Sequence, residues 1–169
     1  MPSDEKPLVE ALVSECRLSG TELKDALKAF LRKYGDGLPE DVINGAVSDK
    51  LLDKWVYYCA PDNPKEVIAG FHYENNDWYL CTLKNAAVRI DDRRKGIGVK
   101  LYQETVTKAK KDPGCHVLAA DVTSDNAASI KLFERMGFKK TNRFCWAPNE
   151  KPADILHFVN FPADGNECK

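Results

Sequence analysis

The chain has 169 residues, 43% of them hydrophobic, and its 25 Lys and Arg residues nearly balance its 26 Asp and Glu residues. This length and apolar content suit a single domain that is large enough to bury a core. The near-neutral charge argues against a nucleic-acid partner held mainly by phosphate contacts and against a polybasic membrane-binding patch. No apolar run approaches the length of a transmembrane span, and residues 1–6 do not resemble a signal peptide.

The six cysteines are scattered, with no Cys-x-x-Cys pair and no spacing typical of a zinc site. Several lie in apolar, strand-like runs, where a buried reduced thiol is the ordinary interpretation. The sequence therefore predicts a reducing, cytoplasmic location and no metal site.

Residues 1–54 are predicted to be helical. Apolar residues recur at helical spacing between residues 6 and 34, and a Gly-Asp-Gly sequence at residues 35–37 ends this stretch. A short helix and a connection are expected over residues 38–54. Residues 8–13 could instead form a first strand, and the rest of this part contains no convincing strand. The side chains expected to be buried at its end are Leu51, Leu52 and Trp55.

Residues 55–161 are predicted to form the sheet and its covering helices, and residues 162–169 a flexible tail. Strand-like runs separated by turn residues cover residues 55–59, 67–73, 78–90, 116–122, 138–146 and 154–161. Helix-like runs flank the fourth strand, over residues 99–110 and 127–136. The apolar spacing of the first of these predicts a buried stripe of Val99, Tyr102, Val106 and Ala109.

The order of these elements predicts one mixed α/β domain. The helix over residues 99–110 joins two neighbouring strands, which should therefore be parallel and connected in a right-handed sense. The last two strands should form a closing pair. Gly137 fits the left-handed position that follows a helix end.

A basic, glycine-containing loop, Arg93-Arg94-Lys95-Gly96-Ile97-Gly98, stands ahead of that helix. Two glycines allow a tight turn, and the absence of side chains lets the first N–H groups of the helix reach a ligand. These N–H groups and the helix dipole favour an anion such as a pyrophosphate. A solvated turn is the alternative. The loop matches neither the Walker nor the Rossmann pattern, because Leu101 stands where the latter needs a third glycine.

The Arg-x-x-Gly-x-Gly pattern at residues 93–98 resembles the acyl-CoA loop of the GCN5-related N-acetyltransferase (GNAT) family. The run from Asp125 to Phe138 resembles the second signature of that family, an Asn followed by a short helix that ends in Gly-Phe. The resemblance covers about residues 55–145. It implies a mostly antiparallel sheet with a splayed central parallel pair, flanked by helices. It also implies an acetyl-CoA-dependent N-acetyltransferase.

The resemblance implies an acetyl-CoA site built from both motifs. The backbone of the glycine loop would hold the diphosphate near its three cations, and the pantetheine arm would pair with the edge of the strand that ends near Val88. Asn126 matches the family Asn that hydrogen-bonds this arm, although a simple helix N-cap explains it equally well. Arg135 corresponds to a basic residue near the ribose phosphate, and a solvated helix face is the stronger explanation for it. The residues expected at the coenzyme are Val88, Arg93, Arg94, Lys95, Gly96, Gly98, Asn126, Ser129 and Phe133.

Phe133 departs from the family pattern. The family commonly has a tyrosine there, whose hydroxyl protonates the sulfur of coenzyme A. Phenylalanine cannot donate a proton, so the thiolate would leave unassisted, or a water, Ser129 or another hydroxyl would substitute.

Removal of a proton from the attacking amine requires a base, since an alkyl amine has a pKa near 10.4. Asp121 is the first candidate, because it fills a slot where related N-terminal acetyltransferases place a His or a Glu. A carboxylate that caps the next helix or faces solvent is the alternative. His72 and Tyr79 follow in falling order, and a structural role is favoured for His72. His116 and His157 are expected to lie farther away.

The sequence thus predicts acetyl transfer to a primary amine by direct attack in a ternary complex. The acceptor could be a small amine or polyamine, or a protein lysine or N-terminus. One alternative is a non-catalytic acyl-CoA-binding regulatory module, and another is an interaction domain without a cofactor. No metal, nucleic-acid or membrane partner is expected. The resemblance leaves a homodimer through edge strands open.

Overall fold

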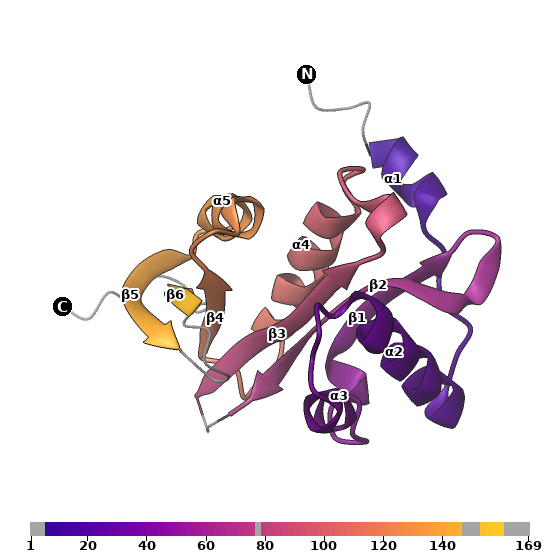
Figure 1. The fold of residues 1–169 in the computed structure, drawn as a ribbon, viewed down its shortest axis with the longest axis horizontal. Coiled ribbons are helices and arrows are strands. Elements are labelled where there is room, and N and C mark those ends of the chain that lie inside the picture. Colours follow the sequence, from indigo (N-terminus) through magenta and orange to yellow (C-terminus); the bar gives the residue numbers. More distant parts are fainter. Residues whose placement is uncertain (1–5, 77–78, 147–152, 161–169) are drawn as a thin grey trace. The chain divides into compact units, whose positions relative to one another are not determined.

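The structure is a computed structural model that describes residues 6–76, 79–146 and 153–160. Its elements are α1 (Lys6–Leu12), α2 (Gly20–Tyr34), α3 (Glu40–Ala46), η1 (Leu52–Lys54), β1 (Trp55–Ala60), β2 (Asn63–Asn75), β3 (Leu80–Val88), η2 (Ile90–Asp92), α4 (Ile97–Lys110), β4 (Val117–Thr123), α5 (Ala127–Arg135), β5 (Lys139–Trp146) and β6 (Ala153–Asn160) (Figure 1). The strands form one six-stranded sheet in the order β1-β2-β3-β4-β6-β5. Strands β3 and β4 are parallel, whereas β4–β6, β6–β5 and β1–β2 are antiparallel. This confirms the predicted mixed α/β class with a parallel pair.

The chain divides into two compact units, which are described separately. The first comprises residues 1–73 and 84–105, and the second comprises residues 74–83 and 106–169. The expected separation of a helical part before residue 55 from the sheet-forming core stays a prediction. The expected tail over residues 162–169 lies outside the described residues, as do Trp78 and the connection from 147 to 152.

The core of the first unit lies between α2, α3 and the strands β1 and β2. Helix α2 is amphipathic, and its buried side chains recur on one face at helical spacing. These side chains pack with α3 and with Trp55, Cys59 and Val67. Leu27 and Leu31 are fully buried, so truncating either to alanine should cost about 2–5 kcal/mol of stability. The buried residues of α2 are Leu23, Leu27, Phe30 and Leu31.

The strands β1 and β2 carry helices on both faces. A Cβ at Gly70 would lie 3.0 Å from Trp55 and 3.2 Å from Phe30 of α2, so this face is closely covered by α2. The next residue, Phe71, points to the other face because side chains alternate along a strand. There its ring lies 4.5 Å from the ring of Tyr102 in α4. Helix α4 therefore begins on the face opposite α2.

The second unit contains the parallel ladder and α5. Residues Leu80–Leu83 of β3 pair with Val117–Ala120 of β4, and β4 pairs on its other side with β6. Helix α5 buries Phe133 against the rings of Phe138 and Phe158, whose centroids lie 5.0 and 6.0 Å away. Gly137 has φ +84°, which confirms the predicted left-handed residue after this helix.

The N-terminal part differs from the prediction around Ser14. Helix α1 ends at Leu12, so the alternative strand over residues 8–13 is wrong. Ser14 instead forms an antiparallel bridge with Cys59 of β1, and the Ser14 N–H donates to the Cys59 carbonyl at 2.9 Å. Trp55 is buried as predicted, but Leu51 and Leu52 are only half-buried.

Two cysteines predicted to be reduced form a disulfide. Cys16 and Cys59 are 43 residues apart, and their Cα atoms lie 5.2 Å from each other. The Ser14–Cys59 bridge brings the chain before α2 alongside β1, which places the two sulfurs together. Cys115 and Cys145 are thiols, and only the first of these is buried.

The buried face of α4 is also shifted from the predicted stripe. Val99 is 41% exposed, and Tyr102 is half-buried. The helix begins at Ile97, two residues earlier than predicted, so that residue and Leu101 define the inward face. Thr105 joins this face because its hydroxyl donates to the Leu101 carbonyl at 2.7 Å. Val106 and Ala109 are buried as predicted.

In the part of the chain that the structure describes, no helix is both long enough and apolar enough to cross a bilayer.

Candidate functional site

The glycine loop connects η2 to α4 in the first unit. The first bond of α4 runs from the Lys100 N–H to the Gly96 carbonyl, at 3.1 Å. The N–H groups of Ile97, Gly98 and Val99 precede this bond, and they are the donors that an α-helix leaves without an intrahelical acceptor. With the positive end of the helix dipole, they can hydrogen-bond an anion.

The two glycines of the loop are glycine for different reasons. Gly96 has φ +84°, and a Cβ there would lie 2.9 Å from the Val9 side chain of α1, so the fold itself requires glycine. A Cβ at Gly98 would meet only Val88, at 3.9 Å, which is ordinary contact. Gly98 has a helical backbone, where alanine is the more stable residue. The packing of the described residues does not explain glycine at 98, whereas close approach by a ligand would.

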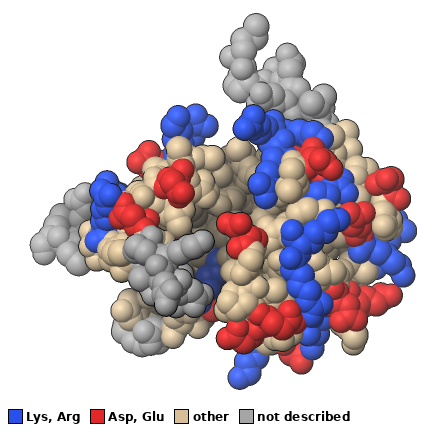
Figure 2. Space-filling model, in the orientation of Figure 1, with Lys and Arg blue, Asp and Glu red and all other residues tan. Residues whose placement is uncertain are grey.

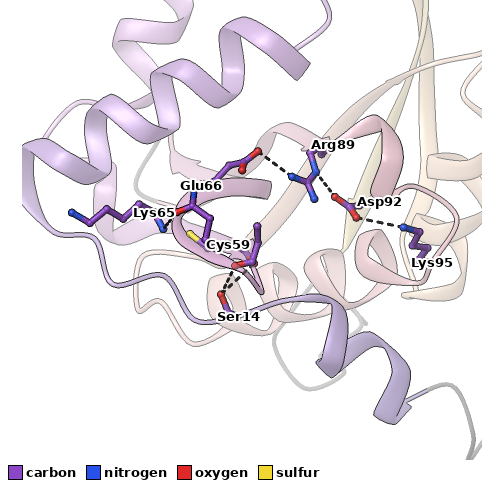
Figure 3. Close-up of polar contacts among 9 residues, drawn as sticks. Ser14, Cys59, Lys65, Glu66, Arg89, Asp92 and Lys95 are labelled. Atoms are coloured by element: carbon purple, nitrogen blue, oxygen red, sulfur yellow. Dashed lines mark hydrogen bonds and ion pairs between the residues drawn. The ribbon is translucent and has the colours of Figure 1, made fainter.

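A chain of ion pairs holds η2 and the loop (Figure 3). The Arg89 guanidinium donates from Nε to Asp92 Oδ2 at 2.5 Å and from Nη1 to Glu66 Oε1 on β2 at 3.0 Å. Lys95 Nζ lies 3.5 Å from the other oxygen of Asp92. The hydrogen bond to Asp92 is the main cause that raises the pKa of Arg89, so its guanidinium stays charged. Asp92 itself is buried.

The three consecutive cations of the loop, Arg93, Arg94 and Lys95, differ in their contacts. Arg93 donates from Nε to the Val88 carbonyl at 3.0 Å, so its head turns back toward the end of β3. Arg94 is exposed and has φ +62°, and Lys95 contacts Asp92. Figure 2 shows Lys and Arg side chains gathered on the surface where Figure 1 places η2 and the start of α4, with acidic side chains beside them. The structure thus brings Val88, the loop cations and Gly98 together within one unit.

Asp121 lies in the second unit, directly after the last paired residue of the parallel ladder. The ladder reaches Ala120, and β4 continues through Asp121 while still pairing with β6. Asp121 stands opposite His157, and its Oδ1 lies 2.6 Å from His157 Nδ1. Phe158, the neighbour of His157, packs on α5, so the Asp121–His157 pair lies on the opposite face of the sheet. The prediction did not anticipate this contact for His157.

Asn126 is the N-cap of α5, because its Oδ1 accepts a hydrogen bond from the Ser129 N–H at 3.1 Å. The capping explanation is therefore confirmed, and contact of Asn126 or Ser129 with a coenzyme stays a prediction. Phe133 is 2% exposed within an aromatic cluster. The loop residues and these α5 residues belong to different compact units.

The other residues predicted as bases have different surroundings. His72 is completely buried, and its ring stacks on Trp55 with centroids 4.4 Å apart, as expected of a structural histidine. Tyr79 is 39% exposed, and its carbonyl accepts hydrogen bonds from His116 and Val117. Arg135 is exposed, which agrees with a solvated helix face.

Sequence reasoning missed the group formed by Glu66, Arg89 and Asp92. A weak signal existed, because Arg89, Asp92 and Lys95 follow one another at intervals of three residues, the spacing that ion pairs use along a helical turn. His157 gave no such signal, since its partner depends on the pairing register of β4 and β6.

Comparison with protein families matches residues 20–138 to the acetyltransferase (GNAT) family. Among curated proteins, L-methionine sulfoximine/L-methionine sulfone acetyltransferases of Pseudomonas paraeruginosa and Pseudomonas aeruginosa are each 48% identical over 86 residues. Each match covers 47% of this chain and 48% of the relative. The chain therefore matches about half the length of these relatives.

Solved structures share the fold over most of the chain. The ribosomal-protein-S18-alanine N-acetyltransferase from Escherichia coli is 20% identical with a TM-score of 0.67, over 93% of this chain and 97% of that one. Arabidopsis thaliana NAA60 in complex with acetyl-CoA is also 20% identical with a TM-score of 0.67, over 84% of this chain and 94% of that one. At this identity the likeness concerns the fold alone.

Proposed function

Because the chain belongs to the acetyltransferase (GNAT) family, we propose that it is an acetyl-CoA-dependent N-acetyltransferase that acts on a primary amine by direct attack in a ternary complex. The observation that carries this proposal is the family match over residues 20–138, which includes both the glycine loop and the Asn126 motif. Gly98 supports the proposal independently, because a ligand that approaches the backbone closely would account for a glycine at this position.

In this proposal the loop residues hold the diphosphate. The N–H groups of Ile97, Gly98 and Val99 donate to phosphate oxygens, and Arg94 and Lys95 supply positive charge nearby. Arg93 acts through the Val88 carbonyl, which it already contacts, and so fixes the end of β3. Asn126 and Ser129 contact the pantetheine arm. Acetyl-CoA, when bound, supplies a thioester carbonyl to the amine and a thiolate leaving group.

Asp121 is the proposed base, and its hydrogen-bonded partner is His157. An alkyl ammonium must lose a proton before its nitrogen can attack, and a carboxylate in contact with an imidazole can receive that proton and pass it on. Asp121 is 48% exposed, so water can carry the proton between it and the amine. The Asp121–His157 pair comes directly after the last paired residues of β3 and β4, where the family resemblance implies that the two strands diverge.

Phe133 cannot protonate the departing thiolate. Its ring is buried against the apolar rings of Phe138 and Phe158, whereas an acid at this position would need polar groups or water to carry its proton. A thiol is a stronger acid than an alcohol, so the thiolate can leave without an acid, or it takes a proton from water or from Ser129.

We infer that the acceptor is the α-amino group of a small amino acid. The support is the 48% identity to acetyltransferases of methionine sulfoximine and methionine sulfone. The ribosomal-protein-alanine acetyltransferase, which would favour a protein N-terminus, is 20% identical and shares the fold only. A polyamine or a protein lysine has less support.

The second candidate is a non-catalytic acyl-CoA-binding regulatory module, which the phenylalanine at 133 favours. Release of free thiol from acetyl-CoA separates the two. Under the first proposal, L-methionine sulfone stimulates release above the level without amine, whereas spermidine and an alanine-initiated peptide stimulate it less. If coenzyme A binds but no amine stimulates release, the regulatory module replaces the enzyme. If coenzyme A does not bind, both proposals fail.

The cytoplasmic location and a homodimer stay predictions. The Cys16–Cys59 disulfide counts against a reducing compartment, because structural disulfides are rare there. Alkylation of thiols in freshly lysed cells, followed by mass spectrometry of the Cys16 peptide, tests the location.

A further inference from the structure

Asp92 is a buried carboxylate that the proposed reaction does not use. It is the last residue of η2, its side chain is 9% exposed, and it stands immediately before the three cations of the loop. A carboxylate is costly to bury unless charged partners compensate for the lost hydration. An acidic side chain beside a site for a diphosphate also opposes the anion by charge. The contacts of Asp92 must therefore offset both the cost of burying its carboxylate and its repulsion of the anion.

Both oxygens of Asp92 contact cations on opposite sides of it in sequence. Oδ2 accepts from Arg89 Nε at 2.5 Å, and Oδ1 lies 3.5 Å from Lys95 Nζ (Figure 3). Arg89 is in turn fixed to β2, because its guanidinium contacts Glu66 at 3.0 Å and its N–H donates to the Ile68 carbonyl at 2.7 Å. The carboxylate thus connects the loop to the sheet.

The segment spanned by the Asp92–Lys95 pair has an unusual backbone. Arg94 has φ +62°, a left-handed conformation that residues with side chains rarely adopt, and Gly96 follows with φ +84°. Such a segment keeps its shape only when its surroundings hold it. Among the described residues, the contacts beside Arg94 include the Asp92–Lys95 ion pair, the Arg93–Val88 hydrogen bond and a hydrogen bond from the Arg93 N–H to the Ile90 carbonyl at 3.2 Å.

We propose that Asp92 is a positioning residue for coenzyme A. Held by Arg89, it fixes residues 93–96 in the shape that presents the N–H groups at the start of α4 to the diphosphate. It also keeps the Lys95 ammonium beside the loop. This inference rests on the proposed function, because it takes the diphosphate as the ligand of the loop. It adds that a negative side chain promotes the binding of a negative ligand.

The sign of the effect distinguishes positioning from simple charge. Removing a negative charge near a diphosphate should tighten binding if the charge acts only through space. Removing Asp92 should instead weaken binding, because the loop then loses its shape. Asp91 is the matched control, since it is the adjacent acidic residue and its side chain is exposed.

The experiment is calorimetric titration of the full chain with coenzyme A at one fixed salt concentration. Asp92→Asn should bind about tenfold more weakly than wild type, at the lower end of the cost of one charge-assisted hydrogen bond, because the lost bond is within the protein and acts on the ligand only through the loop. Asp91→Asn should bind as tightly as wild type or tighter. Arg89→Lys should also weaken binding although it keeps the charge, because a lysine cannot contact Glu66 and Asp92 together. In steady-state kinetics, Asp92→Asn should raise KM for acetyl-CoA and leave kcat unchanged.

Equal affinity of Asp92→Asn and Asp91→Asn, with wild type binding normally, overturns the positioning role and leaves the proposed function standing. Absence of any heat with wild type overturns both. If Asp92→Asn does not fold, Arg89→Lys decides the question, and wild-type affinity in that variant overturns the role.

Discussion

Replacing Gly98 with alanine separates the demands of the fold from those of the ligand. The added Cβ would lie 3.9 Å from the Val88 side chain and would meet no closer atom, so the fold can accept it. Gly98 lies in the first turn of α4, where alanine loses less conformational freedom on folding than glycine. We therefore expect Gly98→Ala to stabilise the protein while weakening coenzyme A binding.

The two effects have different sizes. Glycine to alanine at a compatible site stabilises by about 0.4–1 kcal/mol, which should raise the melting temperature by roughly 1–4 °C in a chain of this length. If the diphosphate binds at the start of α4, a phosphate oxygen comes within hydrogen-bonding distance of the Gly98 N–H, and the added methyl group crowds that oxygen. Losing one hydrogen bond to a charged group costs about 1.5–3 kcal/mol, which corresponds to roughly 10- to 150-fold weaker binding. Gly98→Asp adds a negative charge, so its loss should be larger.

The matched control is Gly45→Ala in α3, another helical glycine, where a Cβ would have no atom within 4 Å. Thermal unfolding without ligand and calorimetric titration with coenzyme A are measured for both variants. Gly45→Ala should gain a similar stability and keep wild-type affinity. If Gly98→Ala also keeps wild-type affinity, the N–H groups at the start of α4 do not hold the diphosphate and the reasoning is wrong.

Three further predictions concern the base, the disulfide and the closing strands. Asp121→Asn should lower turnover about 100-fold or more near neutral pH with coenzyme A affinity unchanged, and turnover equal to that of wild type across the pH range would exclude a base role. Cys16→Ser should lower the melting temperature by roughly 8–16 °C, because removing a disulfide between residues 43 apart costs about 4 kcal/mol in the chain-entropy model. An equal melting temperature of wild type with and without reductant would contradict this. The hydrogen bond from Arg143 lowers the pKa of Asp154, so this carboxylate contributes stability above its unfolded pKa, near 3.9, that is lost as the pH falls through the lower folded value. Unfolding at a series of pH values below 4 should therefore show a smaller acid-dependent loss in Arg143→Gln, and identical curves would refute the assignment.

Features fixed by a few neighbouring residues could be predicted from the sequence. The left-handed Gly137, the cap at Asn126 and the turn ahead of α4 depend on local backbone chemistry, and all three are present. The parallel β3–β4 pair followed from the helix between the two strands, because such a connection permits only one arrangement. The buried stripe of α4 was misjudged because a start at Ile97 rotates the inward face.

Features that depend on distant residues could not be predicted. The Cys16–Cys59 disulfide needs the Ser14 bridge to β1, and no local pattern marks a partner 43 residues away. The Asp121–His157 contact follows from the register of β4 against β6, and a shift by one residue would put His157 on the other face. The sequence indicated glycine at 96 because a tight turn needs its backbone freedom. It did not reveal the second reason, that a Cβ there would lie too close to Val9, because this depends on where α1 packs.

A crystal structure of the chain with coenzyme A would show whether the start of α4 holds the diphosphate. We expect diphosphate oxygens within hydrogen-bonding distance, about 2.7–3.2 Å, of the backbone nitrogens of Ile97, Gly98 and Val99. We also expect Arg94 to keep its left-handed conformation and Asp92 its contact with Arg89. A diphosphate bound elsewhere, or these N–H groups donating to carbonyl oxygens of the protein in the complex, would contradict the proposed site.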